Sequence, residues 1–202
     1  MNSFPKDKVF IKIIDYLDDI QFKQQVAHYD KYFRTTSKQI KIPKLLKVDF
    51  KNKKLYFEYI DCNLSLLDLF KKYINGDIEF SDIEIFFSKI AMIMELNLDN
   101  GVLHGDLVLH NIYINDDIVL IDCFPPCDLP ERLRFFTWSD EYCGFLFNIF
   151  SNIEVRNFSK YKKILPIIDT LSQVKLIRNC KLLDLCKGCG NSGLDYYRIK
   201  SK

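Results

Sequence analysis

The sequence contains little glycine and proline, and it lacks any long apolar run. Seven glycines and six prolines in 202 residues are too few for a fibrous or disordered chain. The first residues, MNSFPKDKVFIKII, lack the long apolar core and small-residue cleavage site of a secretory signal. No later stretch reaches about 18 uncharged apolar residues, the length that predicts a membrane span. We therefore expect a folded cytoplasmic protein without a membrane span.

The cysteines do not form the pattern of a disulfide framework. Their number, seven, is odd, and no export signal accompanies them. We expect reduced, small core residues, most clearly at the three with apolar neighbours: Cys62, Cys123 and Cys143. A second group contains one C-x-x-C, but a structural zinc site needs four ligands. Packing or a free thiol pair is therefore the expected role of Cys180, Cys186 and Cys189.

Charge is distributed unevenly along the chain. Residues 1–54 hold 13 Lys/Arg and 6 Asp/Glu, residues 55–131 hold 3 and 15, and residues 132–202 hold 13 and 6. A basic flank can attract nucleic acid or an anionic membrane surface. Here the lysines are interleaved with aspartates and aromatic residues instead of forming a basic run. We do not expect a nucleic-acid partner.

The first third of the chain alternates between strand and helix signals. Residues Lys8–Ile14 are β-branched and aromatic, as a half-buried strand requires, and Tyr16–Phe33 has a helical period. The apolar segments 45–50 and 54–60 flank the polar turn 51–54, which predicts an antiparallel hairpin. We expect a small sheet with one helix here.

The remainder is predicted to be mainly helical. Ser65 can cap one helix, which Gly76 would end, and Ser81 with Glu84 forms a capping-box pattern before a second. The segments expected to form helices are 66–73, 83–98, 137–150 and 166–185. Between them, turn residues 115–117 join two short apolar segments that predict a hairpin: Ile112–Ile114 and Ile118–Ile121.

Four polar residues cluster around this second hairpin. His104, Asp106 and Asn111 follow a long helix, and Asp122 ends the second strand. Because a hairpin returns on itself, Asp122 should lie beside Asn111. A carboxylate and an amide oxygen suit magnesium, which also takes substrate phosphates as ligands. Asp106 can accept a proton from an attacking hydroxyl.

The order H-x-D, an asparagine five residues later and a strand ending in Asp resembles the catalytic and metal loops of the protein-kinase-like superfamily. His-Gly-Asp in particular is similar to atypical small kinases of the aminoglycoside phosphotransferase and lipopolysaccharide-kinase-like type. The resemblance implies that Asp106 is the catalytic base and that His104 braces the catalytic loop. It also implies that Asn111 and Asp122 hold Mg²⁺ and that the nucleotide is ATP.

The same resemblance extends to both sides of these loops. Lys12 falls where the family's strand lysine contacts the nucleotide phosphates. FEYIDCNLSLLDLF looks like the family's inter-lobe hinge, which implies adenine contacts along Glu58, Ile60 and Cys62. Asp140 falls near the position of an acidic residue that accepts backbone N–H groups of the catalytic loop. The implied fold is α+β and two-lobed, with a reduced sheet lobe over residues 1–60 and a helical lobe over residues 61–202.

The sequence also departs from the family pattern. Eleven residues precede Lys12 and none is glycine, so the phosphate-covering hairpin is missing or replaced. The first predicted helix offers only glutamines, Gln21, Gln24 and Gln25, where a lysine-pairing glutamate is usual. Two prolines follow Asp122-Cys123-Phe124, which predicts a stiff metal loop.

These observations lead to one main hypothesis with alternatives. The main hypothesis is an ATP- and Mg²⁺-dependent phosphotransferase that moves a γ-phosphoryl group to a hydroxyl of a small molecule or protein. A catalytically inactive kinase-like binding module and an adenylyl transferase remain open. Asp106 and Asn111 could be ordinary turn residues. Lys12 could be an exposed strand-edge lysine, with Lys8 as the other candidate for the phosphate contact.

Overall fold

The computed structural model describes residues 9–38, 40–123, 138–153 and 162–173. The strands of this part are β1 (Val9–Ile13), β2 (Leu45–Asp49), β3 (Lys54–Glu58), β4 (Leu64–Ser65), β5 (Ile112–Asn115) and β6 (Asp117–Leu120). Its α-helices are α1 (Asp19–Thr36), α2 (Leu66–Asn75), α3 (Glu84–Asp99), α4 (Trp138–Ser151) and α6 (Leu165–Leu171). The expected α+β class is confirmed.

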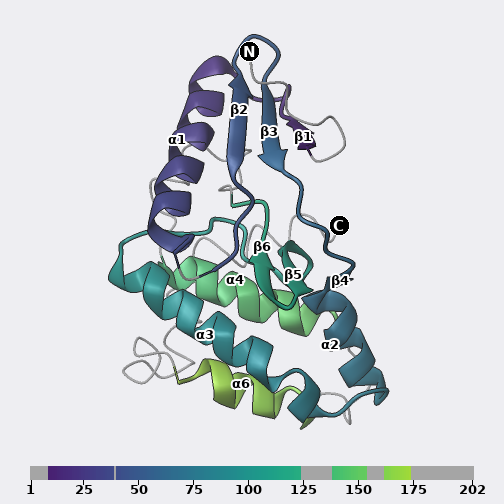
Figure 1. The fold of residues 1–202 in the computed structure, drawn as a ribbon. Coiled ribbons are helices and arrows are strands. Elements are labelled where there is room, and N and C mark those ends of the chain that lie inside the picture. The colour runs from purple at the N-terminus through teal and green to yellow at the C-terminus, as the bar shows by residue number, and fades with distance from the viewer. Residues whose placement is uncertain (1–8, 39, 124–137, 154–161, 174–202) are drawn as a thin grey trace, which may run out of the picture.

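The elements are arranged around two small antiparallel sheets, one ordered β1-β3-β2 and the other β4-β5-β6. In Figure 1 the first sheet and α1 lie at one end of the molecule and the other helices lie at the opposite end. The second sheet lies between them. The predicted hairpins are both present, as β2–β3 and as β5–β6.

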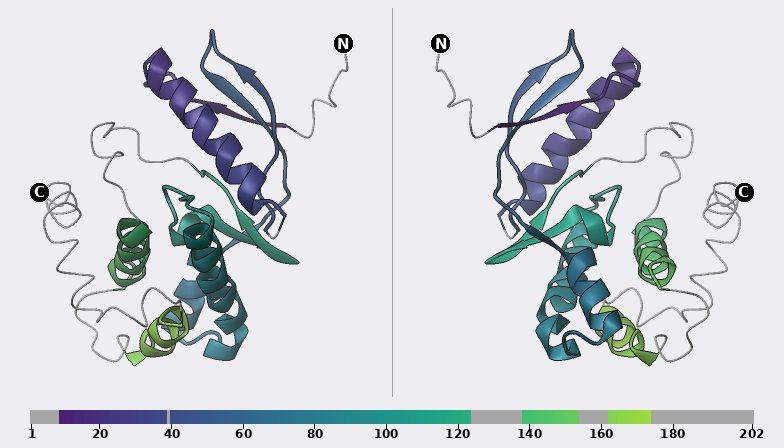
Figure 2. Two further views of the ribbon diagram at one scale, coloured as in Figure 1. Left: turned by 90° about the vertical axis from the view of Figure 1, so that its left-hand side faces the viewer. Right: turned by 90° about the vertical axis from the view of Figure 1, so that its right-hand side faces the viewer.

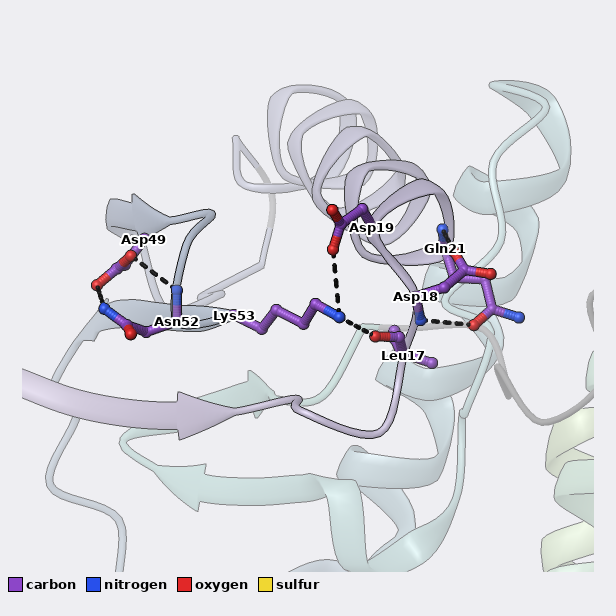
Figure 3. Close-up of polar contacts among 7 residues, drawn as sticks. All are labelled: Leu17, Asp18, Asp19, Gln21, Asp49, Asn52 and Lys53. Carbon is purple, nitrogen blue, oxygen red and sulfur yellow. Dashed lines mark hydrogen bonds and ion pairs between the residues drawn. The ribbon is translucent and has the colours of Figure 1, made fainter.

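The start of α1 is joined to the turn between β2 and β3. Asp18 accepts the N–H of Gln21 at 2.7 Å, and the Gln21 side chain accepts the N–H of Asp18 at 3.1 Å. The Lys53 ammonium donates to the Leu17 carbonyl and pairs with Asp19 at 3.2 Å (Figure 3). This reciprocal cap explains why the helix begins three residues later than the period predicts.

The residues predicted to begin and end α2 do so in the structure. Ser65 accepts the N–H of Asp68 at 3.2 Å, and Asp68 in return accepts the N–H of Ser65. Gly76 ends the helix in the left-handed conformation with φ +89°, which glycine adopts without a steric penalty.

The N-terminus of α3 differs from the prediction. No side chain caps the helix, so the expected capping box of Ser81 and Glu84 is wrong. A short 3₁₀ turn, Phe80–Asp82, precedes it, and the Asp82 carboxylate accepts the N–H of Glu79 at 2.8 Å. A different pair, Glu79 and Asp82, thus acts two residues earlier, at the turn.

The second sheet is linked to the segment before β2. The β5–β6 turn places Asp116 at φ +54°, a conformation that aspartate tolerates better than most residues. Lys41 forms an isolated bridge with Val119, and its carbonyl accepts the N–H of Leu120 at 3.0 Å. The short strand β4, which pairs with β5, was not predicted.

One continuous hydrophobic cluster joins the first sheet and α1 to the helices. Figure 2 shows α1 alongside the first sheet, with the other helices at the opposite end of the ribbon. Fully or almost fully buried members come from four helices: Tyr32, Phe87, Phe145 and Ile167. Helix α4 agrees with its prediction. The predicted helix 166–185 is wrong in its end, because α6 ends at Leu171 with Ser172 as its C-cap, and residues 174–185 lie outside the described residues. The cysteines in the described part are free thiols, as expected, and no helix in this part has the length and apolar character of a membrane span.

Candidate active site

The loop between α3 and β5 is built around a buried histidine. His104 is completely buried, and its ring meets that of Tyr32 edge-on at 5.5 Å between centroids. Its Nδ1 accepts the N–H of Asp106 at 3.3 Å. Burial lowers the pKa of His104 to about 3, while the Ile121 backbone acts in the opposite direction. A neutral imidazole therefore holds the loop from inside.

Asp106 and Asn111 are in direct contact. The Asn111 side-chain amide donates to the Asp106 carbonyl at 3.0 Å and to its carboxylate at 2.9 Å. Asp106 stays accessible to solvent, yet partial burial of its carboxylate raises its pKa. The hydrogen bond from Asn111 lowers that pKa but does not cancel the effect of burial. A solvent-accessible carboxylate with a raised pKa has the properties of a general base.

Asp122 returns to this loop as the hairpin predicts. The N–H of Ile121 donates to the Asn111 carbonyl at 3.0 Å, which places Asp122 next to Asn111 along the strand pair. Asp122 adopts φ +55°, a left-handed conformation that aspartate, like Asp116, tolerates better than most residues.

Lys12 reaches the same place from the first sheet. Its ammonium lies 2.7 Å from Asp122 Oδ1, and only 24% of its side chain is exposed. The carboxylate that pairs with Lys12 is therefore Asp122, whereas the sequence suggested only glutamines as partners from the first helix. Lys8, the other candidate, lies outside the described residues.

A cavity of about 240 Å³ opens beside the Lys12–Asp122 pair. All three predicted hinge residues line it, together with apolar and aromatic side chains from both sheets. The lining residues are Phe10, Tyr29, Pro43, Phe57, Glu58, Tyr59, Ile60, Cys62, Tyr113, Ile121 and Asp122. The structure thus brings Glu58, Ile60 and Cys62 to the same space as Asp122.

Helix α4 supplies two hydrogen-bond acceptors that the sequence did not reveal. Glu141 accepts the N–H of Gly105 at 2.6 Å, and Asn148 accepts the N–H of Leu109 at 2.9 Å. They are seven residues apart and so lie on one face of the helix. The acceptor of the Gly105 N–H is therefore Glu141; the side chain of the neighbouring Asp140, the residue that the resemblance suggested, lies outside the described residues. The sequence signal that could have predicted this role is a pair of side chains with acceptor oxygens, seven residues apart in an otherwise apolar helix.

Glu141 makes the stability of the fold depend on pH. Burial raises its pKa from 4.5 to about 7, against the opposing hydrogen bonds from the loop backbone. Because the folded state holds this proton more tightly, the stabilisation is complete below pH 4.5 and is lost as the pH rises through about 7. The loss is on the order of 3 kcal/mol.

We expect Glu141→Gln to abolish this pH dependence while still accepting the Gly105 N–H. His104, whose pKa is lowered, contributes in the opposite direction over this range, so the measurement is the difference between variant and wild type. In urea unfolding between pH 5 and pH 8, the free energy of unfolding of Glu141→Gln relative to that of the wild type should increase with pH. Glu84→Gln, at an exposed position in the first turn of α3, is the matched control and should keep the wild-type slope. An equal slope in wild type and Glu141→Gln would contradict the assignment.

The donor set suits magnesium only in combination with phosphates. Within the described ranges, no three His, Cys, Asp or Glu side chains are grouped so that they could hold a metal ion. Asn111 and Asp122 offer one amide and one carboxylate oxygen, and Mg²⁺ is commonly bound by one or two protein ligands plus nucleotide oxygens. The C-x-x-C at Cys186 and Cys189 lies outside the described residues.

The polar groups of this site come from four separate parts of the chain. Lys12 belongs to β1, the hinge residues follow β3, Asp106 and Asn111 lie before β5, and Asp122 follows β6. Comparison of the sequence with models of known protein families finds no match. Among curated proteins, none matches the chain either.

Proposed function

We propose that the protein is an ATP- and Mg²⁺-dependent phosphotransferase with a two-lobed, protein-kinase-like fold. The observation that carries this proposal is the ion pair of Lys12 with Asp122, 2.7 Å from nitrogen to oxygen, in which Asp122 also lines the cavity. Residues more than one hundred positions apart meet where a nucleotide's phosphates would need both a cation and a metal ligand. In this proposal residues 1–60 form the sheet lobe and residues 61–202 the helical lobe.

The cavity has the chemistry that a nucleotide base requires. Phe10, Phe57 and Tyr113 offer apolar and aromatic surface, and the segment from Glu58 to Cys62 brings backbone groups to the same wall. Flat, apolar walls with a few backbone polar groups are typical of small-molecule sites. A base bound here would direct its phosphates toward Lys12 and Asp122.

The residues of the loop divide the reaction between them. The acceptor hydroxyl would approach Asp106, which takes its proton as the oxygen bonds to the γ-phosphorus and the bond to the bridging oxygen breaks. Asn111 holds the Asp106 carboxylate in place through its amide. Bound Mg²⁺ would offset charge on the phosphates, with Asn111 and Asp122 as its protein ligands.

A kinase-like binding module without turnover is the second candidate. The observation in its favour is the same ion pair, because an ammonium 2.7 Å from Asp122 competes with a metal ion for that carboxylate. Such a module would bind the nucleotide and leave it intact.

The test of this function is the stabilisation and turnover of nucleotide. At 100 times the Kd, Mg²⁺–ATP should stabilise the fold by about 2.7 kcal/mol, which raises the Tm by about 5–10 °C for a chain of this size. Lys12→Met should weaken ATP binding at least about tenfold, the effect of losing one charge-assisted contact. Lys47→Met is the matched control, because Lys47 is an exposed residue of the same sheet.

Turnover separates the two candidates. ATP labelled at the γ-position and, in parallel, at the α-position should show release or transfer of the γ-label only. Transfer of the α-label would instead indicate an adenylyl transferase. Stabilisation by Mg²⁺–ATP without any label transfer would favour the binding module, and the absence of both effects would overturn both candidates.

A further inference from the structure

Three buried oxygens of neighbouring side chains have no hydrogen-bond partner. Within the described ranges they are Thr36 Oγ1 at the end of α1, Asn97 Oδ1 in α3 and Glu141 Oε1 in α4. Thr36 and Asn97 are 0% exposed, and Glu141 is 4% exposed. Burial removes the water that would otherwise bond such an atom, so a folded protein normally supplies a donor. These three oxygens therefore require donors from within the protein.

A chain of contacting side chains connects these oxygens. The Asn97 amide donates to the Tyr32 hydroxyl at 3.2 Å. Burial raises the pKa of Tyr32, while Asn97 and Thr36 lower it from hydrogen-bonding distance. Tyr32 and Thr36 are four residues apart and share one face of α1. At the other end, Asn97 is also within hydrogen-bonding distance of the Glu141 carboxyl. The chain therefore runs from Glu141 through Asn97 and Tyr32 to Thr36.

The orientation of the Asn97 amide shows where a hydrogen atom is needed. Its nitrogen faces Tyr32, so its oxygen is left for Glu141. An ionised carboxylate has only acceptors, and two acceptors that face each other repel. A proton on Glu141 Oε1 removes this conflict, because the O–H can donate to Asn97 Oδ1 while Oε2 accepts the Gly105 N–H at 2.6 Å. Tyr32 can then donate its own O–H to Thr36 Oγ1, so one proton gives all three oxygens a partner.

Glu141 is the member of this cluster that can lose a proton near neutral pH. Burial raises its pKa to about 7, and the negative charge of Asp106 acts in the same direction. The other ionisable groups of the described residues that pack here stay neutral. Burial holds the pKa of Tyr32 in α1 and of Cys123 after β6 well above their usual values, and it lowers that of His104 to about 3. A proton lost from the cluster therefore comes from Glu141.

We propose that a hydrogen-bond chain of four side chains reverses its direction when Glu141 loses its proton. In the protonated form Glu141 donates to Asn97, Asn97 to Tyr32 and Tyr32 to Thr36. When the proton leaves for solvent, the Asn97 amide turns over and its N–H donates to the carboxylate. The Tyr32 O–H then donates to Asn97 Oδ1, and the Thr36 hydroxyl donates to Tyr32. The only bond broken is the O–H of Glu141, and both forms leave every oxygen of the chain with a partner.

The reversal extends to the loop between α3 and β5. An ionised carboxylate accepts a stronger hydrogen bond than a neutral carboxyl does, so Glu141 should hold the Gly105 N–H more tightly above about pH 7. The two directions of the chain are thus two states of the contact between α1, α3, α4 and this loop. An effect on catalysis through Asp106, the residue after Gly105, is the one part that rests on the proposed function.

Nuclear Overhauser contacts of the Asn97 side-chain N–H protons test the reversal in the full-length protein without nucleotide. At about pH 5 these protons should show contacts with the ring protons of Tyr32. At about pH 9 they should instead show contacts with the side-chain CH₂ protons of Glu141. The change should have a midpoint of about pH 7, the pKa of Glu141.

Two variants separate the reversal from an effect of pH elsewhere. Glutamine has an N–H₂ donor and an oxygen acceptor where the protonated carboxyl has its O–H and its carbonyl, so Glu141→Gln should keep the Tyr32 contacts at both pH values. Glu84→Gln, at an exposed position of α3, should reverse as the wild type does. Loss of the Tyr32 contacts in Glu141→Gln at about pH 5 would contradict the proposal.

The wild-type spectra decide the question even if Glu141→Gln does not fold. Contacts of the Asn97 amide with Tyr32 at both pH values would overturn the proposal and would indicate a fixed amide. Contacts with Glu141 at both pH values would also overturn it, because the amide would then donate to the carboxyl in every state. ATP turnover, absent or present, does not affect this readout.

Discussion

Asp106→Asn is expected to lower the rate of γ-phosphoryl transfer by about 10²–10⁴-fold, the usual contribution of a general base. The substitution keeps the size of the side chain and an oxygen that can accept the Asn111 amide hydrogen bond of 2.9 Å. What it removes is the capacity to take the hydroxyl proton. The ATP affinity should therefore change little, while kcat falls.

The measurement compares kcat and the Kd for Mg²⁺–ATP in the same preparations. Asp116→Asn is a matched control, because Asp116 is an exposed residue of the β5–β6 turn with φ +54°, a conformation that asparagine also adopts. It should leave both quantities unchanged. An Asp106→Asn protein with the wild-type kcat would exclude Asp106 as the base.

Tyr32→Ala is expected to lower the free energy of unfolding by about 3–5 kcal/mol, as truncations of buried aromatic residues do. Tyr32 is 1% exposed in α1, its hydroxyl accepts the Asn97 amide at 3.2 Å, and its ring packs against His104. One side chain thereby joins α1, α3 and the loop between α3 and β5. The truncation leaves a cavity under the loop and removes one acceptor of the Asn97 amide.

Two variants show whether packing or the hydrogen bond dominates this loss. Tyr32→Phe keeps the ring contact with His104 and removes the hydroxyl, so we expect a loss of about 1 kcal/mol. Ile20→Ala, at a position of the same helix that is 68% exposed, should change stability by less than about 0.5 kcal/mol. Urea unfolding measures all three. A loss at Tyr32→Ala no larger than that at Ile20→Ala would contradict the packing described for Tyr32.

The elements that could be predicted are those with local causes. Alternating apolar residues and short polar turns define β2–β3 and β5–β6, and a serine cap with a glycine end defines α2. The errors arise where two local signals compete. The reciprocal cap of Asp18 and Gln21 starts α1 later than its period suggests, and Asp82 caps a 3₁₀ turn in place of α3. Strand β4 has two residues and no local signal of its own.

The residues of the candidate site also differ in how far the sequence could predict their positions. His104, Asp106, Asn111 and Asp122 lie close in sequence, and a hairpin suffices to bring them together. The contact of Lys12 with Asp122 depends on how the first sheet sits against the second, and the sequence did not predict it. The same is true of Glu141, which reaches the Gly105 N–H from a helix 36 residues further along. The sequence could not show which of the two adjacent acidic residues accepts this N–H, because that depends on which face of α4 is turned toward the loop.

The bridge between Lys41 and Val119 limits how the cavity can open. The first sheet continues into the rest of the chain through the segment after β3, and the bridge holds the segment before β2 to β6 as a second attachment. Tyr32 of α1 adds a further contact, with His104 and Asn97. The first sheet should therefore shift against Asp122 only as far as these attachments allow, so the cavity should change little in width while the core stays packed.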